Sequence, residues 1–231
     1  MNQIKENFIN FVFSISSIFI RDIKIQVRNF SYIISIVVFY LMVILIFVFS
    51  IGPDVEQIKI LSVSIIWTIL ILSSSITINK LLKDDYEDGN FAIYQFTGLS
   101  FETVAFSKIL TSWILFQLPL LIIIAFVSLV LNIDINNIKP LIFTLIVGSP
   151  ILSILTLIGS AMMLTNIKNL TLGSLIVLPL SIPIIIFAVG SINTDPDLFI
   201  SQIYILLSIL LALLAVAPWI ISTCIKIAIQ N

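Results

Sequence analysis

The chain has 231 residues, of which 60% are hydrophobic and 10% are charged, and its mean hydropathy is +1.23. A soluble domain is nearer half apolar and a quarter charged, so this composition indicates a membrane protein and excludes a soluble one. The formal net charge of −1 gives no indication of nucleic-acid binding, and one cysteine with no histidine argues against a disulfide, a catalytic site or a metal site.

Residues 1–28 are predicted to form an amphipathic helix at the membrane surface. Polar residues recur there at intervals of three or four: Asn10, Ser14, Ser17, Arg21, Lys24 and Arg28. This spacing places them on one stripe of a helix, with Phe and Ile on the remaining face. We expect the helix to lie in the headgroup layer with its basic end near anionic lipid. The alternative is an apolar N-terminal tail without this role.

Six stretches without Asp, Glu, Lys or Arg follow, and each is close to the ~20 residues that a helix needs to cross the hydrocarbon. They are residues 30–50, 60–78, 109–131, 141–164, 170–192 and 198–224. Turn residues separate them at 52–54, 132–139, 166–169 and 193–197, and Pro140 is expected in the first turn of the fourth span. The sequence therefore predicts one all-α membrane domain over residues 1–231, with a six-helix bundle over 29–225.

Lysine and arginine predict which way the spans point. With the N-terminus in the cytoplasm, nine of the 11 basic residues fall inside: Lys5, Arg21, Lys24, Arg28, Lys80, Lys83, Lys108, Lys168 and Lys226. Only Lys59 and Lys139 then fall outside. Six spans also return the C-terminus to the cytoplasm.

Residues 79–108 then form a cytoplasmic loop that gathers four acids: Asp84, Asp85, Glu87 and Asp88. Each would cost about 2.5–3.5 kcal/mol at the centre of the bilayer, so together they hold the segment in water. Gly89 is expected to end one helix, and Asn90 to cap a second helix of about two turns that Gly98 ends. Ser100 is expected to cap the third span.

The second short helix is expected to expose Phe91, Tyr94 and Phe96 beside the acidic patch. Aromatic side chains rimmed by charge are typical of protein interfaces, so this loop is a candidate docking site for a cytoplasmic partner. The candidate site comprises Asp84, Asp85, Glu87, Asp88, Gly89, Phe91, Tyr94 and Phe96. The alternative is a solvated charge run with a short helix that rests on the membrane.

The spans carry small residues and prolines. Ser149, Ser153, Thr156 and Ser160 share one face of the fourth span, beside Gly148 and Gly159. Kinks are expected at Pro119, Pro150, Pro179 and Pro183. These bends either line a path or form a gate, or are ordinary kinks of a membrane bundle.

An energy source is not apparent in this chain. No Gly-x-x-x-x-Gly-Lys-Ser/Thr motif is present. No ionisable residue falls within a predicted span, which disfavours an ion-coupled carrier. We therefore expect another polypeptide to supply the energy at the 79–108 loop.

Several motifs, in this order on six spans, resemble the cytochrome c maturation protein B (CcmB, haem exporter B) family. They are Arg21-Asp22 with Arg28, Gly52-Pro53, the acidic segment 84–89, Lys108 with Trp113, Gly148-Ser149-Pro150 with Gly159, and the segment 178–183 with Phe187 and Gly190. Ser107 stands where the family pattern has alanine. The resemblance covers most of the chain.

The resemblance implies an ABC-2-like permease subunit that works with a separate ATPase, with C- and D-type membrane subunits and with the haem chaperone E. The complex would release haem-loaded chaperone for cytochrome c assembly, with no cofactor bound by this chain. The acids of the loop would face basic residues of the ATPase. The membrane would be a bacterial inner membrane or, alternatively, the mitochondrial inner membrane.

Two other functions remain open at this point. One is the permease of an ABC-2-type drug, peptide or polysaccharide exporter, although only residues 193–197 separate the last two spans. The other is a purely structural membrane scaffold.

Overall fold

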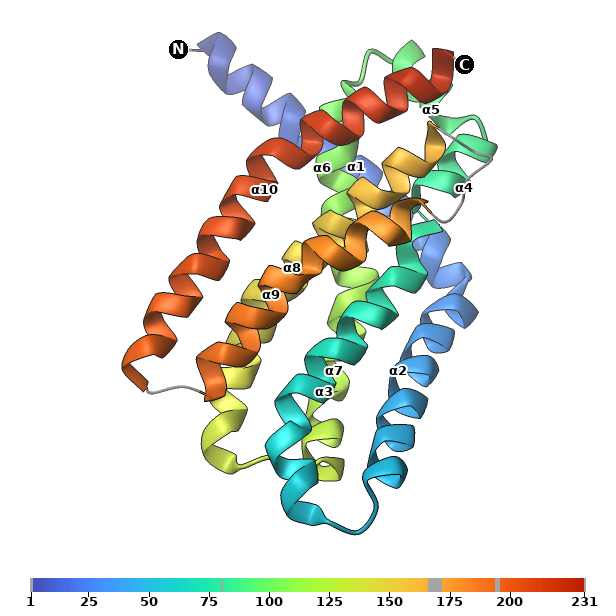
Figure 1. The fold of residues 1–231 in the computed structure, drawn as a ribbon. Helices are drawn as coiled ribbons and strands as arrows, with labels where there is room; N and C mark the ends of the chain where they lie inside the picture. Colours follow the sequence, from blue (N-terminus) through green and yellow to red (C-terminus); the bar gives the residue numbers. More distant parts are fainter. Residues whose placement is uncertain (1, 80, 166–171, 194–195, 231) are drawn as a thin grey trace.

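The computed structural model describes residues 2–79, 81–165, 172–193 and 196–230, and every regular element within them is helical (Figure 1). The elements are α1 (Asn2–Arg28), α2 (Phe30–Ile51), α3 (Val55–Ile76), the 3₁₀ turn Thr77–Asn79, α4 (Leu81–Glu87), α5 (Asn90–Phe96), α6 (Phe101–Ser112), the π-helix Trp113–Gln117, α7 (Leu118–Val130), α8 (Ile135–Leu164), α9 (Leu172–Asn193) and α10 (Pro196–Gln230). Six helical segments are long and apolar enough to cross a membrane, and α6, the π-helix and α7 together form one of them. The predicted all-α, six-span class is confirmed.

The spans run alongside one another as a bundle, and the short helices lie at one of its ends. Figure 1 shows α4, α5 and the C-terminal end of α10 at the end where α1 also lies, while the α2–α3 and α7–α8 turns lie at the opposite end. Both ends of the chain therefore lie on one side, as an even number of spans requires. We call this side the α4–α5 end.

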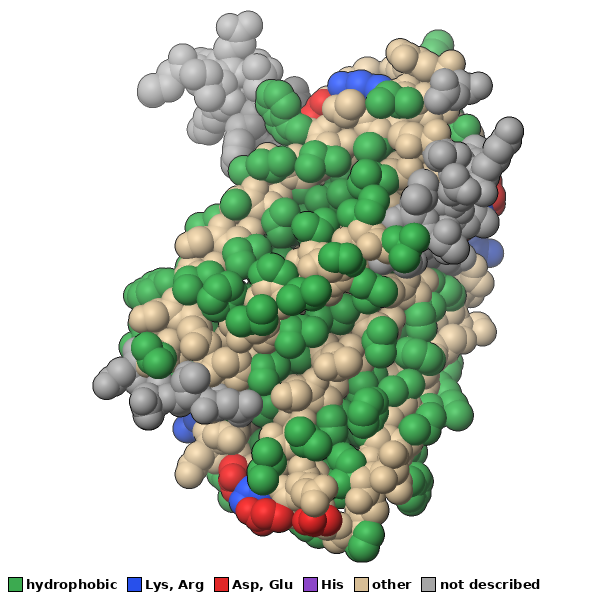
Figure 2. All heavy atoms as spheres, in the orientation of Figure 1, with side chains coloured by type: hydrophobic (Ala, Val, Ile, Leu, Met, Phe, Trp, Pro, Cys, Tyr) green, Lys and Arg blue, Asp and Glu red, His purple; other side chains and the backbone are tan. Residues whose placement is uncertain are grey.

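The surface of the bundle fits a lipid environment. Figure 2 shows hydrophobic side chains over the middle of this face, while Lys, Arg, Asp and Glu gather toward its two ends. An apolar band between charged ends is what a spanning bundle presents to hydrocarbon and to water.

Helix α8 lies at the centre of the bundle. Within its most apolar stretch 72% of the residues are buried, against 22% for α2 and α10. The expected small-residue face is buried throughout: Ser149, Ser153, Thr156 and Ser160. Near its C-terminal end α8 approaches α9 closely. A Cβ added at Gly159 would lie 2.7 Å from Val177 Cγ2 and 3.1 Å from the Gly173 carbonyl oxygen. Small residues permit this approach.

Helices α3 and α8 begin earlier than their apolar stretches predict. Helix α3 begins at Val55, where the Asp54 side chain accepts a hydrogen bond from the Gln57 amide at 3.2 Å. Helix α8 begins at Ile135, so the expectation that Pro140 lies in a first turn is wrong, and Pro140 lies inside the helix. Helices continue past the hydrocarbon into water, where charged residues are tolerated. The turn predicted at 166–169, with the start of the fifth span at 170–171 and residues 194–195, lies outside the described residues.

The bend expected at Pro119 takes the form of a π-helical turn. The Leu118 amide donates to the Trp113 carbonyl, five residues earlier. Proline has no N–H and its ring clashes with the carbonyl four residues before it, so a wider turn directly before Pro119 relieves that conflict.

Candidate functional site

The loop between the second and third spans folds as two short helices separated by a glycine. Gly89 has φ +70° between α4 and α5, and Gly98 has φ +74° after α5. Only glycine adopts such angles without strain, so both predicted helix breaks are confirmed. The expected cap at Asn90 is wrong, because Gly89 holds the cap position and the Asn90 side chain donates to Asp85 Oδ1 at 2.9 Å. Ser100 caps α6 as expected, accepting from the Thr103 amide at 3.3 Å.

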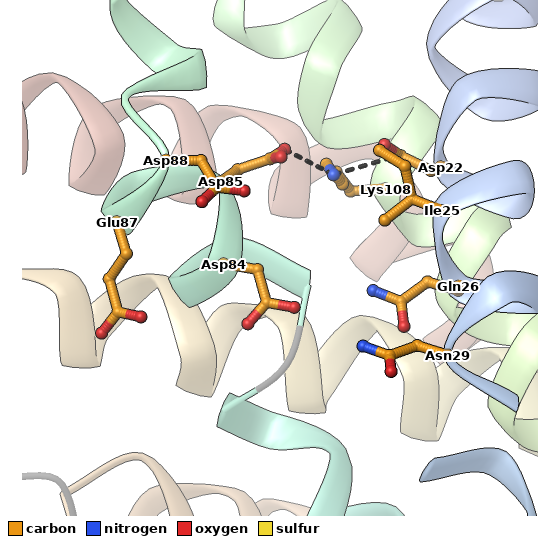
Figure 3. A pocket seen from close by; sticks show the side chains of 9 residues that line it. All are labelled: Asp22, Ile25, Gln26, Asn29, Asp84, Asp85, Glu87, Asp88 and Lys108. Carbon is orange, nitrogen blue, oxygen red and sulfur yellow. Dashed lines mark ion pairs between the residues drawn. The ribbon is translucent and has the colours of Figure 1, made fainter. Parts of the chain in front are cut away.

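Four charged side chains from three helices form an ion-pair cluster, which we define as Arg21, Asp22, Asp85 and Lys108, and all of them but the half-buried Arg21 are buried. Lys108 Nζ on α6 lies 2.7 Å from Asp22 Oδ2 on α1 and 2.5 Å from Asp85 Oδ2 on α4 (Figure 3). The guanidinium of Arg21 lies 3.2 Å from a carboxylate oxygen of each of these acids. The cluster therefore joins α1, α4 and α6, and its two positive charges balance its two negative ones.

Burial makes the members of the cluster depend on one another. The side chains of Lys108 and Asp22 are 2% and 3% exposed. Burial raises the pKa of the Asp22 carboxyl above its ordinary value, and the ammonium of Lys108 opposes that rise. For Arg21, burial acts to lower the pKa, but Asp85 and its neighbours more than offset this, so the pKa is raised. An uncompensated buried charge is costly, so each pair holds its helices in place.

The expectation that α5 exposes Phe91 and Tyr94 is wrong. These residues are 2% and 6% exposed, whereas Phe96 is 94% exposed. The Phe91 ring packs edge-on against Phe101 with centroids 6.4 Å apart, and the Arg21 guanidinium donates a hydrogen bond to the Tyr94 hydroxyl. Positions 91 and 94 are three apart and share the helix face that turns toward the bundle, while position 96 lies on another face.

The four acids of α4 and its end do not form one solvated patch. Asp85 is 5% exposed and belongs to the ion-pair cluster, and Asp84 is half-buried. Glu87 and Asp88 are exposed. The structure thus divides the predicted site into an internal set, Asp85, Phe91 and Tyr94, and an outer set, Glu87, Asp88 and Phe96.

A pocket of about 320 Å³ lies between α1 and α4. Its lining comprises Asp22, Ile25, Gln26, Asn29, Asp84, Asp85, Glu87, Asp88 and Lys108. Figure 3 shows the carboxylate of Asp84 on one wall and the amide of Gln26 on the other, extending toward one another. Gln26 is 4% exposed, and its Oε1 has no hydrogen-bond partner in the described part of the chain.

Comparison with known proteins decides the family. Residues 13–228 match the family described as CcmB protein. The chain belongs to the CcmB family. It is 30% identical to heme exporter protein B of Haemophilus influenzae over 214 residues, covering 91% of this chain and 96% of that relative. It is also 30% identical to the proteins of the same name from Bradyrhizobium diazoefficiens, covering 89% and 94%, and Escherichia coli K12, covering 92% and 98%.

Family membership confirms the resemblance and the non-catalytic permease role that it implies. A CcmB chain is the permease component of the ABC system for cytochrome c maturation. The chain is a multi-pass membrane protein, and the three relatives named above are bacterial.

Four residues at the centre of the site were not predicted as site residues in this CcmB chain. Arg21, Asp22 and Lys108 entered only as motif or orientation residues, and Gln26 was overlooked. One sequence signal could have found Asp22 and Gln26. They follow Ile18 at intervals of four residues, a spacing that places all three on one face of α1, and this face is buried. Lys108 was assigned to the loop because a lysine usually marks the end of a span.

The four prolines at which kinks were expected lie within helices or at the start of one. Pro150, Pro179 and Pro183 lie inside helices, and Pro119 begins α7 after the π-turn. Pro179 and Pro183 are exposed on the outside of this single chain. Their role as a gate stays a prediction.

The last helix is linked to the third span at the α4–α5 end. Ser222 Oγ on α10 donates to Glu102 Oε1 on α6 at 2.6 Å, and Lys226 Nζ lies 3.2 Å from the same oxygen. The Tyr86 hydroxyl on α4 donates to the Ala228 carbonyl at 3.3 Å. The end of α10 therefore contacts both α4 and α6, close to the helices that the ion-pair cluster joins.

Proposed function

We propose that a partner ATPase binds this CcmB chain at α4 and α5 and that ATP hydrolysis by the partner moves these two helices. The observation that carries the proposal is that Phe96 at the end of α5 and the acids Glu87 and Asp88 at the end of α4 are all exposed, on helices that are tied internally to α1 and α6. An exposed aromatic side chain on an element that also presents exposed acids suits a protein interface better than it suits water. The proposed docking surface is Glu87, Asp88 and Phe96.

The other residues predicted for the site would support that surface from within. Asp84, Asp85 and Gly89 set the position of α4 and the break after it, and Phe91 and Tyr94 anchor α5 to the bundle. Movement of α4 and α5 would pass to α6 through the Asp85–Lys108 pair and to α1 through Asp22. Helix α6 continues through the π-turn into α7, so the third span would carry the motion across the membrane.

The proposed assembly has further members. C- and D-type membrane subunits and a haem chaperone of the E type would complete it, and haem-loaded chaperone would be released for cytochrome c assembly. Haem would be held by those other members and ATP by the ATPase, so this chain would bind no cofactor. The absence of histidine from the sequence supports this division of labour.

The proposed location is a bacterial inner membrane, with the α4–α5 end, α1 and the C-terminus in the cytoplasm. The excess of lysine and arginine in the segments assigned to this side supports it. Helix α1 would lie along the headgroups with one face against α6, since Ser107 Oγ donates to the Ile15 carbonyl at 3.2 Å.

The test compares Phe96→Ala with Phe49→Ala in cells that lack their own copy of this subunit. Both phenylalanines are strongly exposed, at 94% and 80%, but Phe49 lies near the opposite end of the bundle. We expect Phe96→Ala to lower co-purification of the ATPase at least tenfold, about 1.4 kcal/mol, and to lower c-type cytochrome levels with it. Phe49→Ala should leave both unchanged.

Normal ATPase retention and normal cytochrome levels in the Phe96→Ala strain would contradict docking at α5. The variant must also reach the membrane in normal amounts, which immunoblotting of the membrane fraction checks.

A further inference from the structure

We propose that a wedge between the beginnings of α8 and α10 binds one anionic phospholipid, with the lipid phosphate at Lys139 and an acyl chain against the aromatic rings of the wedge. The wedge has a volume of about 220 Å³ and is lined by Lys139, Pro140, Phe143 and Phe199. Figure 1 shows both helices beginning at the end of the bundle opposite the α4–α5 end. In the proposed orientation the lipid therefore belongs to the outer leaflet.

Lys139 lies at the level where hydrocarbon gives way to headgroups. The rest of α8, residues 140–164, contains no Asp, Glu, Lys or Arg and is long enough to cross the hydrocarbon. A charge at the end of such a stretch lies at the boundary of the bilayer, because a charge further in would be costly. The ammonium of a lysine on its flexible stem reaches the phosphate layer from there.

The charge of Lys139 is available to a ligand. The predicted orientation places two basic residues on this side of the membrane, and the other one, Lys59, is paired with Asp134 at 2.9 Å. Lys139 is exposed, and it takes part in none of the ion pairs of the described residues. An unpaired cation in the headgroup layer attracts the negative charge of a lipid phosphate.

The rest of the wedge suits an acyl chain. Phe143 follows Lys139 by four residues, so the two share a face of α8, and its side chain is 57% exposed. The half-buried Phe199 forms the wall on α10, and Pro140 adds apolar surface beside Lys139. A gap between helices at hydrocarbon depth forfeits dispersion contacts unless a chain fills it. The wedge thus combines a cation at headgroup level with an apolar groove next to it.

An anionic phospholipid matches both parts of the wedge. A free phosphate ion would pair with Lys139 but leave the rings of Phe143 and Phe199 uncovered. An apolar protein segment would cover the rings but leave the ammonium without a counter-charge. Phosphatidylcholine would fill the groove, but its own ammonium offsets its phosphate. The site should therefore prefer a phospholipid with a net negative charge.

Photoreactive lipids test the site in the full chain, reconstituted in nanodiscs of phosphatidylcholine. One probe is phosphatidylglycerol with a diazirine on an acyl chain, and the other is phosphatidylcholine with the same chain. We expect the anionic probe to label the peptides that contain Phe143 and Phe199 about fivefold more than the zwitterionic probe does. Lys139→Gln should abolish this preference, because it removes the charge that distinguishes the two headgroups.

Lys83→Gln is the matched control, because it removes one positive charge from an exposed side chain at the α4–α5 end. It should keep the preference. Equal labelling by the two probes in the unaltered chain, or an unchanged preference in Lys139→Gln, overturns the proposal. The sequence also carries Asp195 and Asp197 shortly before Phe199, and a pair of either acid with Lys139 would give the second of these results. Neither result bears on docking of the ATPase.

Thermal unfolding in mixed micelles provides a second measurement. Phosphatidylglycerol should raise the unfolding midpoint of the unaltered chain above its value in phosphatidylcholine, because the lipid binds the native state. Phe143→Ala should lose most of that gain, whereas Phe126→Ala on α7, where the side chain is 56% exposed, should keep it. An equal gain in both variants would remove the acyl chain from the wedge and overturn the proposal.

Inorganic phosphate separates the lipid from a free anion. In excess it should leave labelling by the phosphatidylglycerol probe unchanged, since phosphate has no acyl chain to fill the groove. Displacement of the probe by phosphate would assign Lys139 to a free anion and overturn the lipid as the occupant.

Discussion

At the scale of single residues, the buried lysine of α6 is the centre of the site. Lys108 contacts two carboxylates that come from helices far apart in the sequence, and its side chain is 2% exposed. Such a pair contributes little net stability compared with apolar packing, but the loss of one partner leaves the others buried and uncompensated. The cluster therefore makes the relative position of α1, α4 and α6 specific.

Lys108→Ala should accordingly lower the free energy of unfolding by about 3–5 kcal/mol, since Asp22 and Asp85 lose their shared ammonium. Thermal or denaturant unfolding of the purified chain in detergent measures the change. Lys83→Ala is the control, because Lys83 is 42% exposed and its ion pair among the described residues is with the exposed Glu87. The control should change stability by less than about 0.5 kcal/mol. Equal effects of the two substitutions would show that the cluster does not hold the helices.

At the scale of helices, two kinds of glycine position the elements. Gly89 and Gly98 set the direction of the chain on either side of α5 through positive φ angles. Gly159 and Gly173 instead let α8 and α9 approach, since each faces the backbone of the other. Substitution by alanine distinguishes the two roles. A Cβ added at Gly89 would meet nothing within 4 Å, so only backbone strain acts there, whereas a Cβ added at Gly159 would clash with α9.

Gly89→Ala should destabilise the α4–α5 break by about 1 kcal/mol through backbone strain alone. The amides of α5 should then exchange with solvent about fivefold faster, as hydrogen exchange with mass spectrometry would measure. Gly89→Asn is the control, because asparagine tolerates the left-handed region better than alanine. Identical exchange in both variants would argue that the φ of Gly89 is not what shapes the loop.

Gly159→Ala should cost about 1–3 kcal/mol because the new methyl group meets Val177 and the backbone of Gly173. The gain in helix propensity of about 1 kcal/mol offsets part of that cost. The matched control is Gly190→Ala, whose methyl group would lie nearest the end of the flexible Gln202 side chain. The midpoint of thermal unfolding should therefore be lower for Gly159→Ala than for Gly190→Ala. The reverse order would contradict the close approach of α8 and α9.

The sequence predicts the interior of every span and some of the ends, but it misses the starts of α3, α6 and α8, and the reason is visible at particular residues. Glu56, Lys59 and Lys108 lie inside helices, whereas a prediction that ends each span at the nearest charge leaves them outside. The short helix at 90–96 was predicted almost to the residue, because glycines bound it on both sides. Which of its faces turns inward could not be predicted, since the seven residues carry aromatics on more than one face.

The candidate site was half visible in the sequence for a similar reason. The acids at 84–88 and the aromatics of α5 can be predicted as site residues because they cluster along the chain. Asp22 and Lys108 do not cluster in this way, because they lie dozens of residues apart and the packing of α1 on α6 brings them together.

At the scale of the whole molecule, the two ends of the bundle carry separate charged networks. Lys59 pairs with Asp134 at 2.9 Å at one end, and the ion-pair cluster lies at the other. Exposed residues suited to labelling are present at both ends, with Phe96 at 94% and Ile135 at 84% exposed. The sidedness of the protein is therefore open to a direct test.

Cysteines placed at these two positions should react from opposite sides of the membrane. With the single native Cys224 changed to Ser, an impermeant maleimide should label Ile135→Cys in intact cells and Phe96→Cys only after the membrane is permeabilised. The parent Cys224→Ser chain gives the background. Labelling of Phe96→Cys from outside would place the docking surface away from any cytoplasmic ATPase and would falsify the proposed orientation.

The link from α10 to α6 bears on how this protein should be handled. A purification tag or fluorescent reporter fused after Asn231 would begin one turn beyond the residues that hold Glu102 and Tyr86. Any pull from such a fusion would act on the helix that carries Lys108. Figure 1 shows the first turns of α1 projecting away from the bundle, so a fusion before α1 would act on the contacts of α10 with α4 and α6 less directly.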